Sequence, residues 1–247
     1  MYLTIQGLVL RVTDYNDRDS LLTLLTADYG KLTVKARGLR RKNSPLTAPC
    51  QLLALGEFTL FEYKGAYTIN EAHSLALFQG LRRDLQKLSL GTYFAQVAEL
   101  LSQEDMPSPE LLSLTLNCLH ALSQLDVPEL QIKAVFEWRC ACLAGYMPDL
   151  YGCRSCGMKY PDRFDISSGS LECHCCRSAN SDGLRLPVTP GVLDALRYMV
   201  SCDGKSLFRF SVTPQTIQQL SQITEAYLTT QLERGFSTLD FYKSLLI

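Results

Sequence analysis

The pattern of apolar and polar positions changes along the chain near residue 78. The residues before this point are rich in β-branched and aromatic types and are interrupted by turn signals, which favours short strands over helices. We expect five strands, at residues 2–12, 18–26, 31–37, 51–63 and 66–74. Five short strands in about 75 residues predict a small closed barrel of the OB type.

The third of these strands shows the clearest alternation. In the segment KLTVKAR (residues 31–37), apolar and basic residues alternate with the two-residue period of a strand, which places its cations on one face. Gly30 precedes this segment in a turn with Asp28 and Tyr29, and it can adopt the positive φ that a short hairpin loop often needs.

From about residue 80, leucine-rich stretches follow a helical spacing. Ser108, Thr189 and Thr213 each precede a proline, and this pairing of an N-cap residue with a proline in the first turn predicts three helix starts. Apolar positions at helical spacing predict a further helix over residues 128–145.

Five of the ten cysteines lie between Cys153 and Cys176. Two pairs have the C-x-x-C spacing, and sixteen residues separate the pairs, which is typical of zinc ribbons. Four thiolates would close a tetrahedron around one structural Zn²⁺ ion and leave no position for a catalytic water. The predicted ligands are Cys153, Cys156, Cys173 and Cys176. His174 or Cys175 could replace one of them, and a set of free buried thiols is the alternative to a metal site.

These patterns together predict an α+β protein. A five-stranded OB-fold barrel is expected at residues 1–78, followed by an all-helical domain at residues 79–247. A four-cysteine zinc element interrupts the helices at about residues 150–180.

The net charge is formally −1 and gives no indication of a nucleic-acid partner, but the charge is unevenly distributed. Residues 29–56 contain no acidic residue, while the segment KLTVKARGLRRK contains six basic ones. The candidate phosphate contacts are Lys31, Lys35, Arg37, Arg40, Arg41 and Lys42. Because OB barrels commonly bind single strands along a positive groove, we interpret this segment as a nucleic-acid-binding surface. A solvated strand face followed by a basic turn is the alternative.

No motif indicates catalysis. The three histidines are scattered, and Walker A, GxGxxG and HExxH sequences are absent. Asp14, Asp17 and Asp19 alternate as in a cation-binding loop, but the glycine and the distal glutamate of an EF-hand are missing, so a solvated turn is expected. The first residues do not resemble a secretion signal, and no apolar run reaches the roughly 18 residues of a membrane span. We expect a cytoplasmic protein without enzymatic activity and without a membrane partner.

Three passages resemble the bacterial recombination mediator family RecO. They are DYNDRDSLLTLLTADYGKLTVKARGLRRKNS, AYTINEA and FEWRCACLAGYMPDLYGCRSCG, and together they span most of residues 1–176. The resemblance implies an OB fold at the amino terminus, a helical domain interrupted by a zinc element, and no catalytic chemistry.

The resemblance also implies partners. RecO-like proteins bind single- and double-stranded DNA, anneal complementary strands and, with RecR, help to load RecA onto DNA coated by single-strand-binding protein. In this chain the six basic residues of the segment 31–42 would contact DNA, and the four cysteines would bind zinc. A contact with the C-terminal tail of single-strand-binding protein and a nucleoid-associated location in a bacterial cytoplasm are also implied.

Two other functions fit the same sequence features. One is a zinc-ribbon, OB-fold factor that binds RNA or acts in transcription, which a preference for RNA over DNA of the same sequence would support. The other is a protein-bridging module whose basic loop meets an acidic partner, which would bind that partner without any affinity for nucleic acid.

Overall fold

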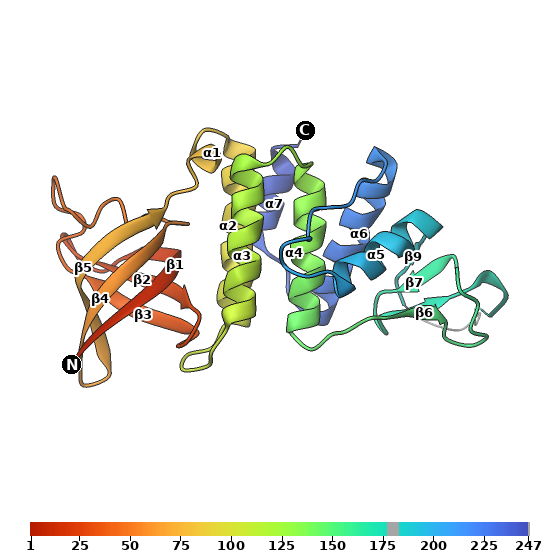
Figure 1. Cartoon of the computed structure of the whole chain (residues 1–247), viewed down its shortest axis with the longest axis horizontal. Helices are drawn as coiled ribbons and strands as arrows, with labels where there is room; N and C mark the ends of the chain where they lie inside the picture. The colour runs from red at the N-terminus through yellow and green to blue at the C-terminus, as the bar shows by residue number, and fades with distance from the viewer. Residues whose placement is uncertain (177–182, 247) are drawn as a thin grey trace. The chain divides into compact units, whose positions relative to one another are not determined.

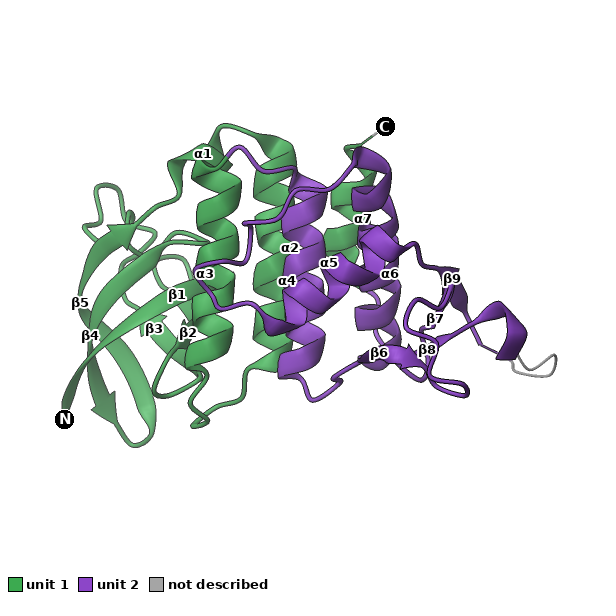
Figure 2. Cartoon of the chain, turned by 45° about the vertical axis from the view of Figure 1, so that its right-hand side comes forward, with its two compact units in different colours: residues 1–125, 236–247 green, residues 126–235 purple. Residues whose placement is uncertain are grey.

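The structure is a computed structural model that describes residues 1–176 and 183–246. The chain forms two compact units, coloured green and purple in Figure 2. Unit 1 comprises Met1–Leu125 together with Phe236–Ile247, and unit 2 comprises Asp126–Gly235.

Unit 1 begins with a closed five-stranded barrel (Figure 1). Its strands are β1 (Tyr2–Asp14), β2 (Ser20–Thr26), β3 (Lys31–Ala36), β4 (Leu55–Tyr63) and β5 (Ala66–Ala76). Around the barrel the order is β1-β2-β3-β5-β4, with β3 and β5 parallel and the other neighbours antiparallel. A closed barrel of five strands in this non-sequential order has the architecture expected of an OB-type domain. The five predicted strands are confirmed.

Alternate positions of the strands fill the barrel interior. In β3, Leu32, Val34 and Ala36 are buried, as the alternation predicted, whereas Thr33 between them is exposed. Gly30 adopts a φ of 61°, and a side chain there would meet the main-chain oxygen of Met106, so both its conformation and its surroundings require glycine.

The start of the fourth strand differs from the prediction. β4 begins at Leu55 and not at residue 51, because the preceding residues form a turn in which Leu53 has a φ of 62°. The backbone of this turn still contacts the barrel, since the Leu53 amide donates to the Val9 carbonyl at 2.9 Å. The turn therefore belongs to the barrel wall although it is not a strand.

Four helices complete the described part of unit 1: α1 (Gln79–Arg82), α2 (Leu85–Leu101), α3 (Pro109–Gln124) and α7 (Ser237–Ser244). Helix α2 contacts β1, α3 and α7. The Tyr93 and Phe236 rings meet edge to face with centroids 5.5 Å apart, which attaches the segment before α7 to α2. Because these helices pack on the barrel and on each other, they belong to the same compact unit as the barrel, and the first segment of unit 1 ends at residue 125. The predicted domain division at residue 78 instead marks the point where the chain changes from strands to helices.

Among its described residues, unit 2 contains three long helices, α4 (Glu129–Leu143), α5 (Pro190–Ser201) and α6 (Pro214–Gln231). A small sheet lies between α4 and α5 in the sequence. Its strands are β6 (Asp149–Cys153), β7 (Arg163–Asp165), β8 (Ser170–Glu172) and β9 (Arg185–Pro187), in the order β6-β8-β7-β9. The element that interrupts the helices is therefore itself a small sheet.

A cluster of aromatic rings joins this sheet to the helices. Trp138 of α4 lies 5.7 Å from Phe164 of β7 and 5.1 Å from Tyr227 of α6, centroid to centroid. The Trp138 indole nitrogen donates to the Leu196 carbonyl of α5 at 3.2 Å, so its single polar atom is satisfied in the core. These contacts fix the sheet against the helices of unit 2.

A buried network of charges joins α4 to α6. The Lys133 Nζ atom lies 2.9 Å from Glu137 Oε1 and 2.8 Å from Glu225 Oε2, and the Lys133 and Glu137 side chains are 1% and 0% exposed. Burial raises the pKa of Glu137, and the nearby Lys133 ammonium acts in the opposite direction. The charges compensate one another only while α4 and α6 stay in this register.

The three predicted helix starts differ in their capping. Thr189 Oγ1 accepts from the Val192 amide and Thr213 Oγ1 from the Thr216 amide, as N-cap residues do. Ser108 precedes α3 as predicted, but its hydroxyl donates to the Met106 carbonyl at 3.1 Å and does not cap the helix.

Replacing Thr213 by alanine should lower the free energy of unfolding of unit 2 by about 1 kcal/mol, since one amide of the first turn of α6 loses its acceptor. Ser108→Ala is the matched control and should change the stability of unit 1 by much less. Urea unfolding followed by circular dichroism measures both effects, and equal losses would show that the capping bond is not the cause.

Candidate functional site

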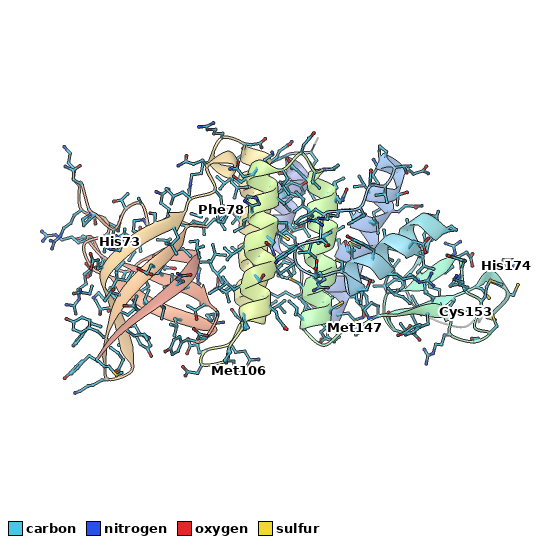
Figure 3. The ribbon with its side chains drawn as sticks, in the orientation of Figure 1. His73, Phe78, Met106, Met147, Cys153 and His174 are labelled. Atoms are coloured by element: carbon cyan, nitrogen blue, oxygen red, sulfur yellow. The ribbon has the colours of Figure 1, made fainter. Side chains whose placement is uncertain are left out.

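Four cysteine side chains converge in unit 2. The Sγ atoms of Cys153, Cys156, Cys173 and Cys176 all lie within 4.8 Å of one another. Figure 3 labels Cys153 and His174, which mark the two segments that meet at this cluster. A tetrahedron with metal–sulfur bonds of about 2.3 Å has sulfur atoms about 3.8 Å apart. The 3.6 Å between the sulfurs of Cys156 and Cys173 agrees with that spacing, so these residues could hold one metal ion.

The backbone forms two tight turns that aim these sulfurs at each other. In the first turn, the Gly157 amide donates to the Cys153 carbonyl at 2.8 Å, and Gly157 has a φ of 74°. In the second, the Cys176 amide donates to the Cys173 carbonyl at 3.0 Å. Strands β6 and β8 pair in parallel and bring the two turns together.

The surroundings favour a thiolate at Cys153. Burial acts to raise its pKa, but the amides of Cys156, Ser155 and Cys173 donate to the sulfur and lower the pKa to about 6. Hydrogen bonds with the sulfurs of Cys173 and Cys156 raise the pKa of Cys176, because neighbouring thiols cannot all ionise without a compensating charge. A divalent cation among the four sulfurs would supply that charge.

The geometry favours the four predicted cysteines over their two neighbours. His174 and Cys175 are exposed and lie outside the group of converging sulfurs. The His174 amide donates to Asp162 Oδ1 at 2.7 Å, and the His174 Nδ1 atom lies 3.8 Å from the Cys175 sulfur. Residues 177–182, at the end of the predicted zinc element, lie outside the described residues.

In unit 1, three of the six candidate phosphate contacts are engaged by other groups of the protein. The Lys31 Nζ atom donates to the main-chain oxygen of Glu99 on α2 at 3.2 Å. The Lys35 ammonium lies 3.3 Å from an Asp19 carboxylate oxygen. The Arg40 guanidinium lies 3.3 Å from an Asp14 carboxylate oxygen and also donates to the Asn16 carbonyl at 2.9 Å. The acidic residues of the β1–β2 hairpin therefore partly neutralise the basic segment, although residues 29–56 themselves contain no acid.

The other three candidates are exposed. Arg37, Arg41 and Lys42 lie in the loop that follows β3, and within the described residues no salt bridge involves them. We call these three residues the basic loop. Their cationic groups are available to phosphates, because phosphate contacts use exposed lysine and arginine side chains.

Asp19 holds the basic loop against the β1–β2 hairpin. Its Oδ1 atom accepts from the Gly38 amide at 2.9 Å, and its Oδ2 atom accepts from the Asn16 side chain at 3.1 Å. The Arg40 amide donates to the Arg18 carbonyl at 3.1 Å and adds a second attachment. Arg18 is exposed next to this attachment and adds a cation that sequence reasoning missed, because acidic neighbours surround it in the chain.

The Asp19 carboxylate should stabilise unit 1 at neutral pH and cease to do so in acid. The Gly38 amide, the Asn16 side chain and Lys35 lower its pKa from 3.8 to about 2. Since the folded-state pKa is depressed, the contribution is complete above about pH 4 and is lost as the pH falls through 2. Melting temperatures of the unsubstituted protein and of Asp19→Asn, compared from pH 5 to pH 2, should converge at the acid end. A difference that stays constant over this range would contradict the assignment.

None of the helices in the described ranges 1–176 and 183–246 combines the length and the hydropathy that crossing a bilayer requires.

Comparison with known proteins covers both units. The family Recombination protein O N terminal matches residues 1–78, and the family Recombination protein O C terminal matches residues 82–240. The chain belongs to the RecO family. This confirms the resemblance drawn from the three sequence passages.

Three curated relatives of the family match this chain over most of their length. DNA repair protein RecO of Acetivibrio thermocellus is 32% identical over 244 residues, which cover 99% of this chain and 97% of the relative. The protein of the same name from Heliobacterium modesticaldum is 31% identical over 246 residues, covering 95% and 88%. That from Alkaliphilus metalliredigens is 28% identical over 248 residues, covering 99% and 100%. The matched length therefore spans both the barrel and the segment that carries the cysteine cluster.

Proposed function

We propose that this chain is a DNA repair and recombination mediator that binds single- and double-stranded DNA and anneals complementary strands. Membership of the RecO family supports the biological process, and the relatives carry the name DNA repair protein. The DNA-binding part of this proposal rests on the basic loop. Arg37, Arg41 and Lys42 are exposed on a loop that Asp19 and Arg40 attach to a barrel of OB type.

The arrangement suits annealing through electrostatics. Two DNA strands repel each other through their phosphates, and cations that neutralise phosphates on both strands reduce that repulsion and release condensed counterions. The hydrogen bonds between the β1–β2 hairpin and the loop hold the backbone in place before DNA arrives, so less ordering is required on binding. Affinity should consequently fall steeply as the salt concentration rises.

The cysteine cluster is proposed to hold one structural Zn²⁺ ion. Four thiolates would fill the coordination sphere of zinc, so the ion would stabilise the small sheet and would not activate a water molecule. We infer that the protein has no catalytic activity of its own. In the cell it would act in the cytoplasm, in association with the nucleoid. There it would bind RecR and the C-terminal tail of single-strand-binding protein, and it would help to load RecA onto DNA coated by that protein.

The test is a salt series of binding to a fluorescent single-stranded DNA and to RNA of the same sequence, together with annealing of two complementary DNA strands followed by energy transfer. We expect DNA binding that weakens with salt and annealing faster than that of the free strands. A preference for RNA would favour the RNA-binding alternative. Binding to an acidic protein partner without any affinity for nucleic acid would favour the bridging alternative.

A further inference from the structure

One exposed aromatic side chain lies among the cations of the barrel. Tyr15 directly follows β1 in the β1–β2 hairpin, and 57% of it is exposed. The Lys35 ammonium lies 4.5 Å from the centroid of its ring. Arg18 lies in the same hairpin, and its main-chain carbonyl accepts a hydrogen bond from the Arg40 amide. The ring is therefore placed where the hairpin meets the loop that carries the phosphate-binding cations.

The position of this ring is fixed by the hairpin. Asn16 Oδ1 accepts from the amides of Arg18 at 2.9 Å and Asp19 at 2.8 Å, and the Tyr15 amide donates to the Asp19 carbonyl at 3.1 Å. Lys35 occupies one face of the ring, and its ammonium is held in turn by Asp19 at 3.3 Å. A ring with a cation on one face and more than half of its surface exposed can present the other face to a flat partner.

The other exposed aromatic residues of the barrel lie in different surroundings. Tyr2 and Phe61 pack against each other with centroids 5.4 Å apart. Tyr63 is 61% exposed and lies at the end of β4. Tyr15 is thus the exposed barrel aromatic whose hairpin turn is hydrogen-bonded to the loop that carries Arg37, Arg41 and Lys42.

We infer that Tyr15 is the base-stacking residue of the DNA-binding surface and gives that surface its preference for single strands. This inference rests on the proposed function. The bases of a duplex already stack on one another, so only an unpaired base can offer its face to Tyr15, while the basic loop holds phosphates of either form. Because every base has an aromatic face, Tyr15 confers no preference among bases.

The same contact assists annealing. When a bound strand pairs with its complement, its base leaves Tyr15 and enters the duplex stack. The duplex then keeps only its phosphate contacts, so the protein releases the product more readily than it releases the substrate strands.

Three variants test the inference: Tyr15→Leu, the conservative Tyr15→Phe, and Tyr63→Leu as a matched control that also removes an exposed tyrosine near a lysine. In Tyr15→Leu we expect single-strand affinity to fall roughly 5- to 100-fold, as base–aromatic stacking suggests. Duplex affinity should change less than about twofold, and the salt dependence should stay the same because no phosphate contact is lost. Tyr15→Phe should keep most of the single-strand affinity, and Tyr63→Leu should bind both forms as the unsubstituted chain does.

A second measurement places the contact directly. A single strand carrying 5-iododeoxyuridine should crosslink to Tyr15 under ultraviolet light. Unchanged single-strand binding in Tyr15→Leu, an equal loss for both DNA forms, or a crosslink confined to Tyr63 overturns the inference while leaving the proposed function standing. Absence of DNA binding by the unsubstituted chain overturns both. Melting temperatures of the variants show whether any loss reflects unfolding.

Discussion

Replacing Cys173 by serine should leave the protein without a stoichiometric metal ion and should unfold the small sheet of unit 2. Cys173 follows β8 and supplies one of the four sulfurs that lie within 4.8 Å of one another. The strands of this sheet are three to five residues long, so backbone pairing alone gives little stability. Zinc binding stabilises comparable zinc-finger peptides by on the order of 10 kcal/mol, which is the largest effect expected of any single change in this chain.

The neighbouring Cys175 offers a matched control. It is exposed and lies outside the converging group, so Cys175→Ser should keep the metal and the stability of the unsubstituted chain. Elemental analysis identifies and counts the bound metal, and hydrogen exchange in residues 149–172 reports on the sheet. A chain that lacks stoichiometric zinc, or a Cys173→Ser variant that retains it, would contradict the four-thiolate site.

Replacing the three cations of the basic loop by alanine should weaken DNA binding more than any other change on the protein surface. In the variant Arg37→Ala, Arg41→Ala, Lys42→Ala, three exposed cations are lost while the attachments through Asp19 and Arg40 remain. Each phosphate contact contributes about 0.7 to the slope of log affinity against log salt for a single strand, so the slope should become shallower by about 2. At about 0.1 M salt this corresponds to a loss of roughly 100-fold in affinity.

A control with the same change in net charge separates the local effect from the global one. Lys64, Lys205 and Arg234 are exposed and lie away from the basic loop in the sequence. Replacing these three by alanine should change affinity and salt slope much less. Fluorescence anisotropy measures both variants, and equal losses would mean that overall charge, and not the basic loop, governs binding.

The barrel and the cysteine cluster could be predicted because their signals are local in the sequence. The alternation in residues 31–37 determines which β3 side chains are buried, since successive side chains of a strand point to opposite faces. The C-x-x-C spacing likewise determines which sulfurs can converge on a metal, and the structure brings those four together.

The sequence could not show which basic residues of the segment 31–42 are exposed to phosphates and which are bound by other groups of the protein. Lys35 and Arg40 meet acidic residues of the β1–β2 hairpin, and Lys31 meets a main-chain oxygen of α2 that lies 68 positions away. These partners depend on how distant segments fold together. The sequence also could not show that Ser108 leaves its helix uncapped. Its hydroxyl donates to the nearby Met106 carbonyl and does not bond to the first turn of α3.

The course of the chain also constrains the order in which the protein is made. Helix α7 belongs to unit 1, yet all of unit 2 is synthesised between α3 and α7. Until that last helix has left the ribosome, α2 lacks the Phe236 ring and the other contacts that cover it in unit 1. The face of α2 that contacts α7 therefore stays without this cover while the whole of unit 2 is synthesised, although the barrel core is already complete in sequence.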